Sequence, residues 1–172
     1  LFSEFTPIDI FEYVSNNNLN KLSLKITMEN FIINLKLVSK RKLKNREINN
    51  IIKRICLIYL IKHKDDKEYS NINLTIIFTD AKKTLPKSNT YKVLGPREIN
   101  SGLASFGDSK ILIHRSEEHS KLLIHELIHL FKIDLSHIQF NFLSNIVDIN
   151  KSVQTIPNES ITETLAVIIN CI

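Results

Sequence analysis

The chain has 172 residues, of which 43% are hydrophobic, and it carries a formal net charge of +5. This size predicts a single globular domain over residues 1–172, and Cys56 and Cys171, which form no CxxC pair, exclude a disulfide framework. We therefore expect reduced thiols and favour a reduced intracellular compartment, and a leader or prodomain removed before Leu1 is also compatible with the sequence.

The first half of the chain predicts a short helix, a hairpin and a long helix. The short helix is expected from Pro7 to about residue 14. Residues 22–28 alternate between apolar and polar, and 31–38 supplies a partner strand. Apolar residues at helical spacing then predict a long amphipathic helix over 45–63. We expect the charged stretch that follows to be a loop, and 72–78 to be a third strand.

A basic cluster lies between the hairpin and the long helix. No aromatic residues are interleaved with it, so we interpret it as a solvated turn and expect no nucleic-acid partner. We also expect no membrane segment, because no stretch has the ~18 consecutive apolar residues that a spanning helix needs. The cluster consists of Lys36, Lys40, Arg41, Lys42, Lys44 and Arg46.

The second half of the chain predicts a loop, a hairpin and three helices. After a loop at 81–96, residues 99–106 and 110–115 read as two paired strands. A helix capped by Ser116 is expected to run to about Ile133. Two further helices are expected at 136–150 and 158–171, the second beginning after Pro157.

The helix that begins near Ser116 contains the sequence HELIH, which is an HExxH motif. His125 and His129 lie about 40° apart around the helix axis and one turn along it, so both rings can reach one ion. Glu126 lies beside them, within reach of a metal-bound water. Histidine also favours helix less than lysine or glutamate, so the pair is a poor choice for an ordinary exposed stripe. The motif therefore predicts metal binding and activation of water.

A catalytic zinc site needs three protein ligands and an open position for water, so a third ligand is required outside this helix. The stretch Asn158-Glu159-Ser160-Ile161-Thr162-Glu163 offers two candidates. Glu159 and Glu163 lie one turn apart on the same helical face, and their spacing does not decide which of them contacts the metal.

In these motifs the chain resembles the gluzincins, zinc metallopeptidases in which HExxH is followed downstream by a helix that reads NExxSD. The resemblance implies one Zn²⁺, with His125, His129 and Glu159 as ligands and Glu126 as the catalytic carboxylate. It also implies that Glu163 accepts a hydrogen bond from the first histidine, although Glu163 stands where the family has Asp. A second gluzincin pattern, in which a small residue follows three positions after the ligand, fits Glu163 instead; we favour Glu159.

The same C-terminal segment is similar to uncharacterised metallopeptidase-like proteins of large DNA viruses. The predicted elements and the gluzincin resemblance together imply an α+β fold, a minimal zincin-like domain with a small mixed or antiparallel sheet packed on the long helix and on the HExxH helix. Residues 1–115 would form the lobe of sheet and helix, and 116–172 the metal-binding helices.

The expected activity is zinc-dependent hydrolysis of a peptide or protein substrate, with Glu126 as general base and then general acid. The edge strand Ile111-Leu112-Ile113 could pair with an extended substrate. The alternative is a catalytically inactive zinc-stabilised binding or structural module with the same fold. The donor to the oxyanion stays unassigned among five side chains, and the oligomeric state is left open. These five are Tyr69, Tyr91, His114, His119 and His137.

Overall fold

The computed structural model describes residues 6–29, 31–62, 71–83, 98, 100–105, 108–133 and 158–172. The predicted helix at 136–150 lies outside these residues, as do most of the two predicted loops at 62–70 and 81–96.

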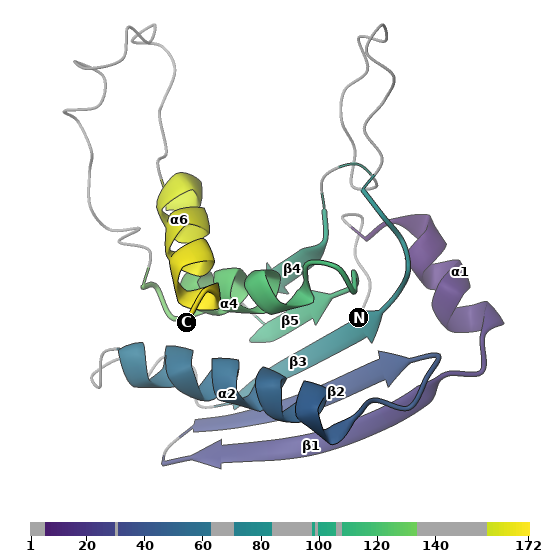
Figure 1. The fold of residues 1–172 in the computed structure, drawn as a ribbon, viewed down its shortest axis with the longest axis horizontal. Coiled ribbons are helices and arrows are strands. Elements are labelled where there is room, and N and C mark those ends of the chain that lie inside the picture. The colour runs from purple at the N-terminus through teal and green to yellow at the C-terminus, as the bar shows by residue number, and fades with distance from the viewer. Residues whose placement is uncertain are drawn as a thin grey trace, which may run out of the picture.

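The structure is an α+β fold in which the described part of the chain forms five strands and four helices. The sheet is mixed and has the order β1-β2-β3-β5-β4 (Figure 1). The pairs β1/β2 and β4/β5 are antiparallel hairpins, whereas β2/β3 and β3/β5 are parallel. The strands are β1 (Asn20–Met28), β2 (Phe31–Ser39), β3 (Asn71–Phe78), β4 (Gly102–Ser105) and β5 (Lys110–Ile113).

Helices cover the two faces of the sheet unequally. Alternate strand residues, such as Leu35, Leu74 and Ile111, form the main core with the apolar faces of α2 and α4. On the opposite face α1 packs through Ile10 against the far ends of β2, β3 and β5. Helix α6 packs on α4 (Figure 1). The helices are α1 (Ile8–Asn16), α2 (Asn45–Ile61), α4 (His119–Leu130) and α6 (Asn158–Asn170).

The prediction that Ile111, Leu112 and Ile113 form an edge strand is wrong. They make up most of β5, which lies between β3 and β4, and all three side chains are buried. The backbone of β5 pairs with strands on both sides, so it has no free edge for an additional strand. Among the described strands the edge on this side of the sheet is β4.

The predicted N-terminus of the HExxH helix also needs correction. Helix α4 begins at His119, and Glu118 rather than Ser116 is the residue before its first turn. The Ser116 hydroxyl donates to the Thr79 carbonyl at 2.7 Å, so this side chain ties the segment to the end of β3 instead of capping the helix. Similarly, α1 begins at Ile8, one residue after Pro7.

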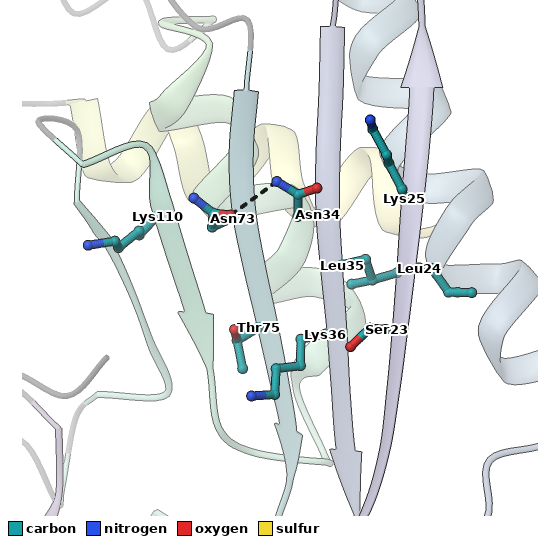
Figure 2. A pocket seen from close by; sticks show the side chains of 9 residues that line it. All are labelled: Ser23, Leu24, Lys25, Asn34, Leu35, Lys36, Asn73, Thr75 and Lys110. Carbon is teal, nitrogen blue, oxygen red and sulfur yellow. Dashed lines mark hydrogen bonds between the residues drawn. The ribbon is translucent and has the colours of Figure 1, made fainter.

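The outer face of the sheet has a polar hollow beyond the area that α1 covers (Figure 2). Its volume is about 520 Å³, and Lys25, Lys36 and Lys110 stand around it. Asn34 links the strands here by donating to Asn73 at 3.1 Å. The hollow lies on the face of the sheet opposite α4 and is therefore separate from the HExxH motif.

None of the helices that the structure describes has the length and apolar character needed to cross a membrane.

Candidate metal centre

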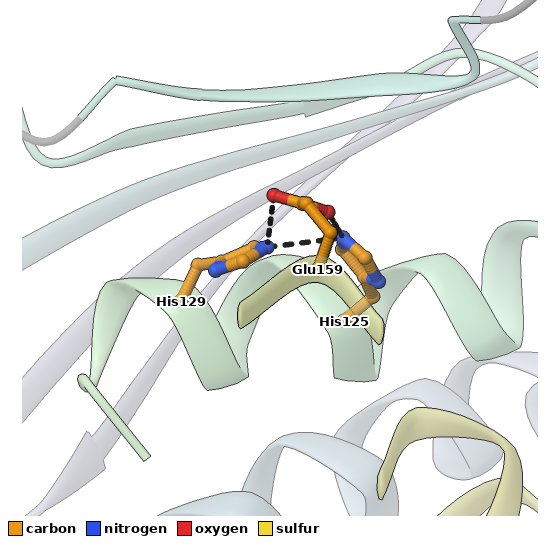
Figure 3. A group of neighbouring side chains, drawn as sticks. All are labelled: His125, His129 and Glu159. Carbon is orange, nitrogen blue, oxygen red and sulfur yellow. Dashed lines mark hydrogen bonds and ion pairs between the residues drawn. The ribbon is translucent and has the colours of Figure 1, made fainter. Parts of the chain in front are cut away.

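Helix α4 presents both histidines of the HExxH motif on one side. Its buried residues, among them Leu123, Leu127 and Leu130, pack into the core, which turns His125 and His129 toward α6. Both side chains are mostly buried, with exposed fractions of 15% and 14%. Their Nε2 atoms lie 3.1 Å apart, so the two ring nitrogens face the same point (Figure 3).

Glu159 in the first turn of α6 completes a group of three ligand-type side chains. Its Oε2 lies 3.4 Å from Nε2 of His125, and its Oε1 lies 3.2 Å from Nε2 of His129 (Figure 3). One donor atom from each of the three residues falls within 4.8 Å of the others, which is close enough to hold a metal ion. The structure therefore brings together the two histidines and the favoured glutamate of the sequence prediction.

The donor set also fits the geometry of zinc. Bond lengths of about 2.0–2.2 Å place neighbouring ligands of a tetrahedral zinc ion about 3.3–3.6 Å apart. The separations of 3.1, 3.2 and 3.4 Å between these donor atoms are close to that range. Two imidazole nitrogens and one carboxylate oxygen are common zinc ligands, and three of them leave a fourth position open.

The second glutamate of α6 contacts the other side of His125. Oε2 of Glu163 lies 3.3 Å from Nδ1 of His125, while its Oε1 accepts from Nζ of Lys121 at 2.5 Å. The hydrogen bond from Lys121 lowers the pKa of Glu163, and burial opposes that shift only partly. An ionised carboxylate at Nδ1 favours the tautomer with Nδ1–H, which leaves the Nε2 lone pair for a metal.

Burial lowers the pKa of His125, and the neighbouring His129 lowers it further. The carboxylates of Glu159 and Glu163 oppose this shift but do not cancel it. The site therefore favours a neutral imidazole at position 125, which is the form that binds a metal.

The Glu126 carboxylate lies beside Gly102 of β4 and lines the same cleft as His125 and Glu159. The side chain is buried, and burial raises the pKa of its carboxyl to about 7, although His129 acts in the other direction. A Cβ on Gly102 would lie 3.3 Å from Oε1 of Glu126 and 2.9 Å from Leu122. The missing side chain of Gly102 thus makes room for the carboxylate. A carboxyl with this pKa can accept and return a proton near neutral pH.

A cleft of about 540 Å³ runs along α4 beside these groups. Residues 100–102, at the start of β4, line one side, and the first turns of α6 line the other. Glu118 lies at the N-terminal end of α4, where it accepts from Lys83 at 2.8 Å and from Ser101 at 2.9 Å. The cleft therefore contains the candidate catalytic carboxylate, two candidate ligands and several charged side chains.

The two candidate oxyanion donors that the structure describes, His114 and His119, lie outside this cleft. His114 is buried at the end of β5, and His119 lies against Phe78 with its Nδ1 2.7 Å from the Ser116 carbonyl. Neither of them lines the cleft, and Tyr69, Tyr91 and His137 fall outside the described residues.

Sequence reasoning gave no role to Lys121 or Gly102, which both lie in the cleft. Lys121 precedes His125 by one turn, so its place on the same stripe was available from the sequence. A glycine inside a predicted strand, such as Gly102, indicates that another group approaches the backbone closely, but the sequence does not show which group this is.

Comparison of the chain with models of protein families, with curated proteins and with solved structures found no match.

Proposed function

We propose that the protein is a zinc metallopeptidase that hydrolyses peptide bonds. The observation that carries the proposal is the convergence of His125, His129 and Glu159 on one point, at separations that suit zinc, with the buried carboxylate of Glu126 next to them in sequence. A metal site that only stabilises the fold does not require a buried carboxylate such as that of Glu126 in an adjacent cleft. The motif and the cleft together favour a catalytic centre.

Each residue has a role that follows from its chemistry. When bound, the zinc ion supplies a Lewis acid that lowers the pKa of its water to about 7 and polarises the substrate carbonyl. Glu126 accepts the proton of the attacking water and delivers it to the amine that leaves. Glu163 orients the ring of His125 by its contact with Nδ1.

An extended peptide could enter the cleft along β4. This strand has one partner among the described strands, β5, and its first residue, Gly102, lines the cleft. Addition of a peptide strand to that edge would pair it with the backbone groups of β4 that face away from β5 and lay the peptide beside α4. The proposed substrate edge is therefore β4, because β5 is an internal strand.

The test compares zinc content and cleavage of a diverse peptide library for four chains. We expect the wild-type chain to hold one zinc and to cut peptides, and Glu126→Gln to keep its zinc while its rate falls by about 10²–10⁴. His125→Ala should lose both properties. Glu117→Gln is the matched control, because Glu117 is exposed on the segment before α4 and does not line the cleft.

Two results would contradict the proposal in different ways. A wild-type chain that holds zinc but cuts no peptide would instead be a zinc-stabilised module without turnover. Cleavage that survives Glu126→Gln would remove Glu126 from the mechanism.

A further inference from the structure

Five side chains of α4 and α6 alternate along the line where these helices meet. Lys121, His125 and His129 follow one another at intervals of one turn on α4, and Glu163 and Glu159 do so on α6. Lys121 contacts Glu163, Glu163 and Glu159 both contact His125, and Glu159 contacts His129. Lys121 is therefore the end of a row of charged and polar contacts that includes all three candidate ligands.

We infer that Lys121 is a positioning residue of the metal centre, an inference that rests on the proposed zinc site. Its ammonium holds one oxygen of Glu163, so that the other oxygen stays at Nδ1 of His125. The ring of His125 is thereby fixed with Nε2 toward His129 and Glu159.

The position of Glu159 depends on the same contact. The apolar contacts of α6 with the core come from Leu165, Ala166 and Ile169 in its later turns. Glu159 lies in the first turn, and its side chain is 73% exposed. The pair of Lys121 and Glu163 is the ion pair between α4 and α6 that lies one turn from Glu159. Without it, the turn that carries the third ligand would rely on the buried Thr162 and on the contacts of Glu159 with the two histidines, so we expect this turn to be less firmly held.

Lys121 could instead act only as a nearby positive charge, and the two roles predict opposite results. A bare positive charge opposes a dication, so its removal would tighten zinc binding. A positioning residue does the reverse, because its removal loosens His125 and Glu159. We expect the positioning effect to be the larger one, because Lys121 contacts Glu163 directly, whereas its charge is separated from the candidate metal position by Glu163 and His125.

The experiment measures zinc affinity by competition with a chelator at physiological ionic strength. We expect Lys121→Met to weaken zinc binding by about tenfold, in the lower part of the range for groups that orient metal ligands. Lys121→Arg keeps a cation in reach of Glu163 and should restore wild-type affinity. Lys53→Met is the matched control, because Lys53 is an exposed lysine of α2 that does not line the cleft.

A second readout uses the visible spectrum of the Co²⁺-loaded chain, which depends on ligand geometry. At saturating Co²⁺ we expect the spectrum of Lys121→Met to differ from wild type and that of Lys121→Arg to match it. If Lys121→Met does not fold, as judged by circular dichroism, Lys121→Gln replaces it with the same expectations.

Three outcomes would overturn the inference. They are zinc binding by Lys121→Met that equals or exceeds wild type, an unchanged cobalt spectrum, and an equal loss of affinity in Lys53→Met. Each leaves the proposed function intact if the wild-type chain binds zinc and cuts peptides. A wild-type chain that takes up no zinc would overturn both proposals. Zinc binding without peptide cleavage would overturn the peptidase alone.

Discussion

The two carboxylates of α6 approach the ring of His125 from opposite sides. Glu159 lies 3.4 Å from Nε2, the atom that faces His129, whereas Glu163 lies 3.3 Å from Nδ1 on the other side of the ring. An imidazole binds a metal through one nitrogen and donates a hydrogen bond through the other. Glu159 therefore lies where the two Nε2 atoms converge, as expected of the proposed third ligand, and Glu163 lies at Nδ1; helical spacing alone left this choice open, and the sequence analysis favoured Glu159.

This division of roles predicts unequal effects of substitution. Glu159→Ala should abolish zinc binding in the range where wild type is saturated, because a direct ligand is lost. Glu163→Gln should weaken binding by about 10–100-fold, because only the orientation and basicity of His125 change. Competition with a chelator of known affinity measures both. A larger loss in Glu163→Gln than in Glu159→Ala would reverse the assignment.

Gly102 lies at a position where the surrounding atoms leave no room for a side chain. A methyl group there would lie 3.1 Å from the backbone oxygen of Leu112, which cannot move without disturbing β5. We expect Gly102→Ala to destabilise the protein by about 1–3 kcal/mol, the usual cost of overpacking, and to displace Glu126. Urea unfolding and the rate of peptide cleavage test the two effects.

The matched control for Gly102 is Ser105→Ala in the same strand. Ser105 pairs with Lys110, and neither its side chain nor that of Lys110 lines the cleft. We expect the Ser105→Ala variant to keep the wild-type free energy of unfolding and the wild-type rate of peptide cleavage. If Gly102→Ala behaves in the same way, the glycine is not required by the carboxylate.

At the level of the elements, local patterns predicted most of the structure. Both hairpins, the long helix and the final helix are found close to their expected bounds, because alternation and helical spacing are properties of neighbouring residues. The proximity of His125 and His129 could be predicted because it depends only on the regular geometry of one helix. The prediction that β5 is an edge strand was wrong because β5 pairs in parallel with β3, a segment that is distant in sequence. The start of α4 was wrong because the Ser116 hydroxyl bonds to β3.

The junction between β5 and α4 should make stability depend on pH. Burial, and then the charge of Arg115, lowers the pKa of His114 to about 4 from its usual 6.5. As pH falls through this window, the unfolded chain takes up the proton first, so stability is present above about pH 6.5 and is lost toward pH 4. Urea unfolding of the zinc-free chain across this range measures the loss.

The variant that isolates this contribution is His114→Gln. We expect the stability of this variant to fall less steeply between pH 6.5 and pH 4. The slope depends on how many more protons the unfolded chain binds than the folded chain, and the variant lowers that number by up to about one. His119 and His125, whose pKa values burial also lowers, contribute in the same direction, whereas Glu126, whose pKa burial raises to about 7, contributes in the opposite direction; all three groups remain in the variant. Equal slopes for wild type and variant would show that His114 is not the titrating group.

At the scale of the whole molecule, the candidate ligands connect two helices that are far apart in sequence. A metal ion bound by α4 and α6 would therefore oppose their separation during unfolding. With free zinc at 100 times Kd, linkage predicts about 2.7 kcal/mol of added stability. For a chain of this size that amounts to a rise in Tm of about 5–10 °C.

Calorimetry with and without zinc measures this shift, and His129→Ala supplies the control. The variant keeps the apolar core but lacks one ligand, so we expect no rise in its Tm. An equal rise in the variant would mean that zinc binds and stabilises the protein at another place.

Anomalous diffraction at the zinc absorption edge, from crystals of the zinc-loaded protein, tests the metal centre most directly. We predict one peak within bonding distance of Nε2 of His125, Nε2 of His129 and a carboxylate oxygen of Glu159, with Glu163 at Nδ1 of His125. The absence of a peak between α4 and α6, or a peak bound by other residues, would contradict the proposed site.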